Sequence, residues 1–155
     1  MKMKIRVYID TSVIGGCLDE EFEVASNMLM EKFKKGEMIA VLSDLTLLEL
    51  QEAPPAVQEI IDEIPEDNIE FVELNEESAG LAKKYIENGV IGPGKLVDAE
   101  HIAIATVNRV DVLVSWNFKH IVNLQKIHGY NSVNLRNGYP LLEIRSPREV
   151  VSYED

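Results

Sequence analysis

The chain has 155 residues, a length that suits one domain with a single core over residues 1–155. Its formal net charge of −12 argues against broad, charge-driven binding to nucleic acid. The one cysteine, Cys17, excludes an internal disulfide, and neither a signal segment nor an apolar run of the roughly 20 residues that a membrane span needs is present, so we expect a cytoplasmic protein with no membrane contact.

The first predicted strand covers residues 4–9 and leads directly into an acid. Asp10 follows the strand, and the hydroxyl residues Thr11 and Ser12 commonly cap a helix. Residues 13–18 are interpreted as a short apolar turn with flexible glycines. A carboxylate at the carboxyl end of a buried strand lies where open α/β sheets place their chemistry.

A second acid follows the second predicted strand. Helical spacing over residues 22–33 and an apolar run over 38–42 predict a helix and then a strand. The next helix, residues 45–52, carries Glu49 on the same face as Leu45 and Leu48, so we expect Glu49 beside the buried side. A carboxylate there is unfavourable unless it is paired or bound to a cation.

A third acid begins the most apolar helix. After a helix over residues 56–64, a strand over 69–74 and a helix over 76–88, the chain reaches a helix predicted for 96–108. This helix is apolar nearly all round, which is typical of a central, packed helix. Asp98 lies in its first turn, which suits the helix dipole, and His101 lies on roughly the same side.

The last third of the chain places an amide after a strand. Residues 111–115 are predicted as a strand, with Asp111 in the turn before it and Asn117 just past its end. The polar segment 123–139 is predicted to form a short helix and loops. A strand over 141–144 and a short helix beginning after Ser146 close the chain.

Strands that alternate with helices predict a three-layer α/β/α domain with a five-stranded, mostly parallel sheet. If the first and fourth strands are neighbours, Asp10 and Asn117 meet at the topological switch point. Asp10, Glu49 and Asp98 would then come together there. Two carboxylates about 5 Å apart repel by roughly 3 kcal/mol at an effective dielectric constant near 20. A divalent cation or raised pKa values must offset this repulsion, and an all-oxygen site suits Mg²⁺ or Mn²⁺.

Four segments contain the acids and Asn117 in a characteristic order. They are YIDTS (residues 8–12), SDLTLLEL (43–50), DAEHIAIA (98–105) and DVLVSWNFKH (111–120). Together they resemble the four acidic blocks of PIN-domain proteins, and most of all those of the VapC-type toxins of bacterial toxin–antitoxin pairs. The resemblance covers roughly residues 4 to 145.

This resemblance implies a Mg²⁺- or Mn²⁺-dependent endoribonuclease that hydrolyses RNA with a metal-activated water. It implies metal ligands at Asp10, Glu49 and Asp98, with support from Thr11 or Ser12. Asn117 occupies the fourth catalytic position and departs from the family, because an amide can donate an oxygen but brings no charge. The resemblance also implies a homodimer and a small antitoxin protein whose tail covers the site.

Several further residues have two interpretations. His101 and His120 could line the groove, and Lys119, Lys95 and Arg109 could contact phosphate, but each could equally be a structural or surface residue. Cys17 and Trp116 are interpreted as packing residues, Glu100 as a surface residue and Asp111 as no ligand.

Two alternatives to an active ribonuclease remain. Asn117 could leave a PIN-like RNA-binding or regulatory module without catalysis. A phosphatase of the haloacid-dehalogenase type also begins with an aspartate after a strand, but it needs a second Asp two residues later, where this chain has Ser12.

Overall fold

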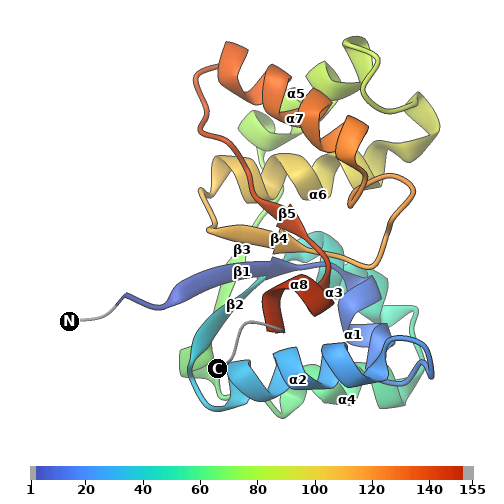
Figure 1. Ribbon diagram of the computed structural model, residues 1–155, viewed down its shortest axis with the longest axis vertical. Helices are drawn as coiled ribbons and strands as arrows, with labels where there is room; N and C mark the ends of the chain where they lie inside the picture. The colour runs from blue at the N-terminus through green and yellow to red at the C-terminus, as the bar shows by residue number, and fades with distance from the viewer. Residues whose placement is uncertain (1–2, 152–155) are drawn as a thin grey trace.

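The computed structural model describes residues 3–151 and contains a five-stranded sheet in the order β3-β2-β1-β4-β5 (Figure 1). All four strand pairings are parallel, which confirms the predicted five-stranded α/β architecture. The strands are β1 (Ile5–Ile9), β2 (Met38–Ser43), β3 (Ile69–Val72), β4 (Val112–Val114) and β5 (Ile144–Arg145).

Helices connect the strands and cover both faces of the sheet. Among the described residues, no helix is long and apolar enough to cross a membrane. The helices are α1 (Thr11–Gly16), α2 (Glu23–Lys34), α3 (Asp44–Gln51), α4 (Pro55–Asp62), α5 (Glu76–Glu87), α6 (Leu96–Val107), α7 (Leu124–Arg136) and α8 (Pro147–Val151), with two short 3₁₀ helices, η1 (Glu66–Asn68) and η2 (Pro93–Lys95).

Alternate residues of β1 divide the core into two layers. Val7 and Ile9 pack into the cluster with α1, α2, α4 and α8, whereas Tyr8 packs into the cluster with α5, α6 and α7. The two layers lie below and above the sheet in Figure 1. All three side chains are fully buried, because successive residues of a central strand point to opposite faces.

The chain reverses its direction of winding at β1. From this central strand it runs outward through β2 to β3 and then returns to the other side for β4 and β5. Ile9 pairs with Val114, so Asp10 comes directly beside the residues that follow β4. The first and fourth strands are therefore neighbours, which is the condition under which Asp10 and Asn117 were expected to meet, and open α/β sheets bind ligands at such a point.

The prediction of a glycine-rich turn after Asp10 was wrong. Residues 11–16 form helix α1, and Asp10 is its N-cap, with its carboxylate accepting a hydrogen bond from the backbone N–H of Val13 at 3.3 Å. Gly16 permits a close approach of α1 to its neighbours, since a Cβ there would lie 2.6 Å from Ser26 Oγ and 2.7 Å from Trp116 Nε1.

Two further differences concern the end of the chain. The segment 123–139 contains a helix of 13 residues. This helix is longer than predicted because polar residues make up part of its buried face. Asn134 is fully buried and accepts a hydrogen bond from the Tyr85 hydroxyl at 2.5 Å. The last strand begins at Ile144, later than predicted, because the side chain of Asn131 bonds both backbone polar groups of Leu142.

We predict that Gly16→Ala lowers the free energy of unfolding by about 1–3 kcal/mol, because the new methyl group collides with the Ser26–Trp116 hydrogen bond. Gly15→Ala in the same helix is the matched control. No heavy atom lies within 4 Å of a Cβ at Gly15, so its replacement is expected to stabilise the helix by up to about 1 kcal/mol. Urea unfolding measures both, and equal effects would contradict the close approach at Gly16.

Candidate active site at the carboxyl ends of β1 and β4

Asp10 is a buried carboxylate held by hydroxyl groups from two elements. Its side chain lies just beyond β1 and the residue is 6 % exposed. Ser12 donates to one carboxylate oxygen at 2.6 Å, and Ser115, just after β4, donates to the other at 2.5 Å. Ser12 also accepts the backbone N–H of Trp116 at 3.0 Å, so the two strand ends are fixed to each other.

The electrostatic environment of Asp10 contains opposing effects. Burial raises the pKa of the carboxyl group above its ordinary value, because the charged form loses its hydration. The nearby imidazole of His101 and the hydroxyls of Ser115 and Ser12 oppose that rise. Asp10 therefore lies where a cation would be strongly stabilising.

Glu49 reaches the site, although the expected face of its helix was wrong. Leu48 is 57 % exposed, and the buried residues of α3 are Thr46 and Leu50. Glu49 nevertheless turns toward α6, where its Oε1 lies 2.8 Å from His101 Nε2. This hydrogen bond lowers the pKa of the Glu49 carboxyl below its ordinary value.

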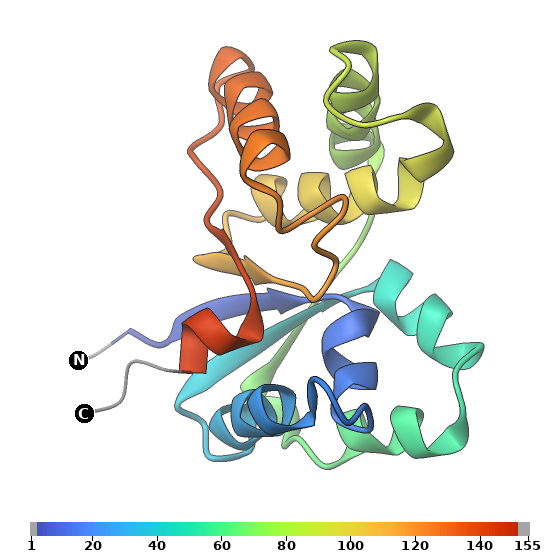
Figure 2. The ribbon, with the colours of Figure 1, turned by 45° about the vertical axis from the view of Figure 1, so that its right-hand side comes forward.

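The imidazole of His101 interacts electrostatically with all three predicted acids. Its ring is buried, at 2 % exposure, one turn along α6 from the half-buried Asp98. Burial alone would lower the pKa of His101. The hydrogen bond to Glu49 and the charges of Asp10, Glu49 and Asp98 outweigh burial and raise that pKa. The charges of the three acids thus all act on one imidazole. Helices α1 and α3 and the loop after β4 gather on this side of the molecule (Figure 2).

Asn117 lies next to the site, but its side chain supports the loop after β4. Its Oδ1 accepts the backbone N–H groups of Lys119 at 3.2 Å and His120 at 2.9 Å. Its own backbone N–H donates to Ser115 Oγ at 2.9 Å, which links the loop to the serine that holds Asp10.

Two residues that hold the acids were missed by the sequence reasoning. Ser115 was treated only as the end of a strand, and Tyr8 only as a strand residue. The adjacent placement of Asp10 and Ser115 at paired strand ends could have identified Ser115. No comparable signal identified Tyr8, whose hydroxyl lies 2.6 Å from His101 Nδ1.

The oxygen atoms that the site offers as ligands are of the type that hard divalent cations prefer. Asp10, Glu49 and Asp98 provide carboxylate oxygens, and the buried hydroxyl of Thr11 has no hydrogen-bond partner in the described structure. That hydroxyl lies near enough to Glu49 to lower its pKa. Within residues 3–151, however, no three His, Cys, Asp or Glu side chains are grouped so as to hold a metal ion. Binding would therefore require side chains to rearrange.

Basic residues gather beside the acids at His120. Burial lowers the pKa of His120, and Asp98 opposes this effect. The charges of Lys95 of η2, Lys119 of the loop and Lys126 of α7 lower that pKa further. The Lys126 ammonium also donates to the carbonyl of Val90 at 3.1 Å.

Arg109 lies at the other end of the sheet. It follows α6, and its carbonyl accepts a hydrogen bond from Arg6 near the beginning of β1, so the structure separates it from the acids. Asp111 likewise accepts the backbone N–H of Arg6 and does not belong to the site. Trp116 and Cys17 are buried, as predicted for packing residues.

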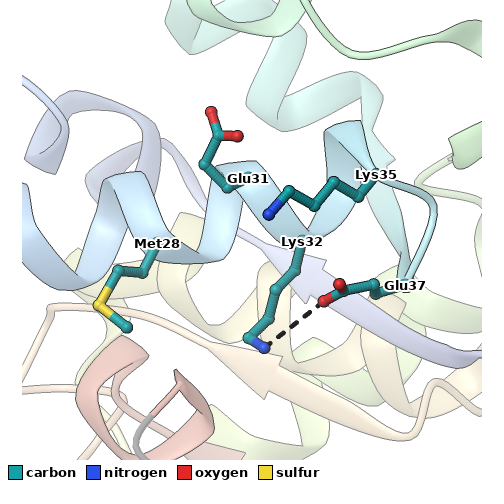
Figure 3. Close-up of a pocket in the computed structure, with 5 residues that line it drawn as sticks. All are labelled: Met28, Glu31, Lys32, Lys35 and Glu37. Atoms are coloured by element: carbon teal, nitrogen blue, oxygen red, sulfur yellow. Dashed lines mark ion pairs between the residues drawn. The ribbon is translucent and has the colours of Figure 1, made fainter. Parts of the chain in front are cut away.

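The pocket drawn in Figure 3 is also remote from the acids. It is lined by residues of α2 together with Lys35 and Glu37, at the amino end of β2, opposite the edge that carries Asp10. An ion pair between Lys32 and Glu37, 3.6 Å long, crosses it.

No protein-family model matches the chain, and no curated protein matches it in sequence. Solved structures do match it. VapBC2 from Rickettsia felis, bound to a DNA fragment from its promoter, is similar at 14 % identity, with 92 % of this chain and 98 % of that chain covered and a TM-score of 0.57.

Two further structures are similar over 74 % of this chain. A toxin–antitoxin complex from Klebsiella pneumoniae is 17 % identical over 88 % of that chain, with a TM-score of 0.53. Mycobacterium tuberculosis VapC20, described as a toxin that cleaves the sarcin–ricin loop, is 9 % identical over 92 % of that chain, with a TM-score of 0.52. At these identities the similarity concerns the fold, and the chain has a VapC-like PIN-domain fold.

Proposed function

We propose that the chain is a divalent-metal-dependent endoribonuclease. The observation that carries this proposal is the buried carboxylate of Asp10 at the switch point, with Glu49 and Asp98 acting on the same imidazole of His101. The fold it shares with VapC20 supports the same class of reaction. Metal-assisted phosphodiester hydrolysis uses carboxylates that hold a divalent cation, and these three acids are the candidates for that task.

Each residue has a distinct task in this proposal. Asp10, Glu49 and Asp98 would hold Mg²⁺ or Mn²⁺, which would supply an activated water and stabilise the charge that develops on the phosphate. Ser12 and Ser115 orient Asp10 by donating to its two oxygens. Asp98 is favoured in the first turn of α6 by the helix dipole.

The strongly acidic composition is compatible with RNA as the substrate, because the positive charge is local. Lys95, Lys119 and Lys126 approach from three separate segments beside Asp98 and His120. Lysines so placed would bind the RNA phosphates and compensate the repulsion by the rest of the surface. We place the RNA backbone along these lysines.

Partners are proposed from the same fold. Because the similar Klebsiella structure is a toxin–antitoxin complex, we propose a small antitoxin protein as a partner of this chain. We also propose a homodimer, from the resemblance of the four acidic blocks, and a cytoplasmic location, from the single cysteine.

A second candidate is a module of the same fold that binds RNA without cleaving it. Two observations favour it: the fourth acidic position is Asn117, whose oxygen is engaged by two backbone N–H groups, and the described acids do not form a closed metal site. In this alternative, the lysines still bind the RNA phosphates, but the acids hold no cation for cleavage.

We predict that Asp10→Asn reduces cleavage of structured RNA in Mg²⁺ or Mn²⁺ by at least about 100-fold. Mutation of a residue that only orients a metal ligand lowers activity by up to this factor, and mutation of the ligand itself should lower it at least as much. Asp62→Asn, an exposed acid at the end of α4, is the control and should cleave like wild type. Equal cleavage by wild type and Asp10→Asn would contradict the proposed function.

Asn117→Asp separates the two candidates. The new carboxylate can accept the same two backbone N–H groups, so the loop is expected to keep its conformation. If the amide is the only defect, the substitution switches on Mn²⁺ binding and cleavage in a protein that otherwise lacks them. An active wild type rules out the non-cleaving module, and an inactive wild type with an equally inactive Asn117→Asp means that the defect lies elsewhere.

The lysines are tested by the salt dependence of RNA binding, measured by fluorescence anisotropy in the Asp10→Asn background, where cleavage is removed. For single-stranded RNA, Lys95→Gln and Lys119→Gln should each reduce the slope of log K against log salt by about 0.7. Lys83→Gln, exposed on α5, should leave the slope unchanged. Equal slopes for all variants would exclude these lysines as phosphate contacts.

A further inference from the structure

A buried line of hydrogen bonds runs from β2 through the core to Glu49. Ser43 Oγ lies 2.7 Å from the hydroxyl of Tyr8, which lies 2.6 Å from His101 Nδ1, and His101 Nε2 lies 2.8 Å from Glu49 Oε1. The four residues come from the end of β2, β1, α6 and α3. The line therefore connects the consecutive elements β2 and α3 with β1 and with α6, and Tyr8 and His101 are 93 residues apart in the sequence.

The burial changes abruptly at the last member. Ser43 and Tyr8 are fully buried and His101 is 2 % exposed, whereas 42 % of the Glu49 side chain is exposed. Buried polar side chains cost stability unless every group is paired, and an apolar replacement of the same shape is often as stable. Only Glu49, at the end of this line of hydrogen bonds, is exposed to solvent. The line is therefore better explained as a means of orienting the Glu49 carboxylate than as a source of stability.

Each member of the line has a partner of the right kind. The Glu49 carboxylate only accepts hydrogen bonds, so His101 Nε2 must carry a hydrogen. With a neutral ring, Nδ1 accepts from the Tyr8 hydroxyl, which in turn accepts from Ser43. Ser43 Oγ accepts the backbone N–H of Thr46 at 3.3 Å.

The line closes on itself through α3. Ser43 is the N-cap of α3, and Glu49 lies on that same helix. The hydrogen bonds and the helix thus form a ring from Ser43 through Tyr8, His101 and Glu49 back to Ser43. A ring of this kind restricts both the beginning of the helix and the side chain that it presents to the site.

We propose that Tyr8 and His101 are positioning residues that hold Oε1 of Glu49 and leave its other oxygen for the cation. This inference rests on the proposed function, because it gives Glu49 the task of a metal ligand. In other metal sites, residues that hydrogen-bond to a metal ligand without touching the metal orient that ligand in the same way.

The test uses Mn²⁺ itself as the probe, with its dissociation constant measured by electron paramagnetic resonance. Tyr8→Phe keeps the ring and removes the hydroxyl, and it should weaken Mn²⁺ binding about tenfold or more. Tyr85→Phe is the matched control: Tyr85 is fully buried on the same face of the sheet, and its hydroxyl bonds Asn134, away from the acids. Both variants lose the two buried hydrogen bonds of the hydroxyl, which Tyr8 makes with Ser43 and His101 and Tyr85 with Thr106 and Asn134. Only Tyr8→Phe should change the affinity for Mn²⁺.

A double-mutant cycle separates positioning from a general structural effect. If Tyr8 acts through Glu49, then Tyr8→Phe has no further effect on the Mn²⁺ affinity of Glu49→Ala. If the wild type binds Mn²⁺ and Tyr8→Phe binds it equally well, the positioning role is overturned while the metal site stands. If the wild type binds no Mn²⁺, the metal site and the positioning role both fail.

A second measurement needs no variant and no metal. In a long-range ¹H–¹⁵N spectrum of the metal-free wild type, His101 should carry a hydrogen on Nε2. A neutral ring with its hydrogen on Nδ1 alone would overturn the inference, because His101 could then donate nothing to Glu49. This readout also keeps the proposal testable if Tyr8→Phe does not fold.

Discussion

The burial of a carboxylate at the meeting point of β1 and β4 is the constraint on which the site depends. Asp10 is 6 % exposed and cannot keep its charge there without compensation. Burial raises the pKa of Asp10, and the imidazole of His101, the hydroxyls of Ser115 and Ser12 and the backbone of α1 oppose that rise. His101 in turn is held by Tyr8 and Glu49, so the local structure around the acids follows from the need to stabilise one buried charge.

Those parts of the fold that depend on local apolar patterns could be predicted from the sequence. The buried runs of β1 and β2 and the apolar helix α6 were identified because hydrophobic periodicity is a local property. Only a short helix was predicted within residues 123–139, where α7 has 13 residues, because Asn134 lies in the core and is stabilised there by Tyr85, 49 residues earlier. The late start of β5 depends on a side chain of another element, Asn131, which bonds the backbone before the strand.

The site was predictable to the same extent. Asp10 and Asp98 stand at a strand end and a helix start, positions that sequence patterns show. The prediction for Glu49 relied on Leu48 marking the buried face, but Leu48 is exposed, and the link to the site is the hydrogen bond to His101. Ser115 and Tyr8 act through partners more than 90 residues away, and such pairs become visible only when the strand order is known.

The central claim is that Asp10, Glu49 and Asp98 together hold one divalent cation. The most direct measurement is the anomalous scattering of a crystal grown with Mn²⁺. The account predicts one peak among the carboxylate oxygens of the three acids, with His101 still bonded to Glu49. A crystal saturated with Mn²⁺ that shows no peak among these side chains would contradict it.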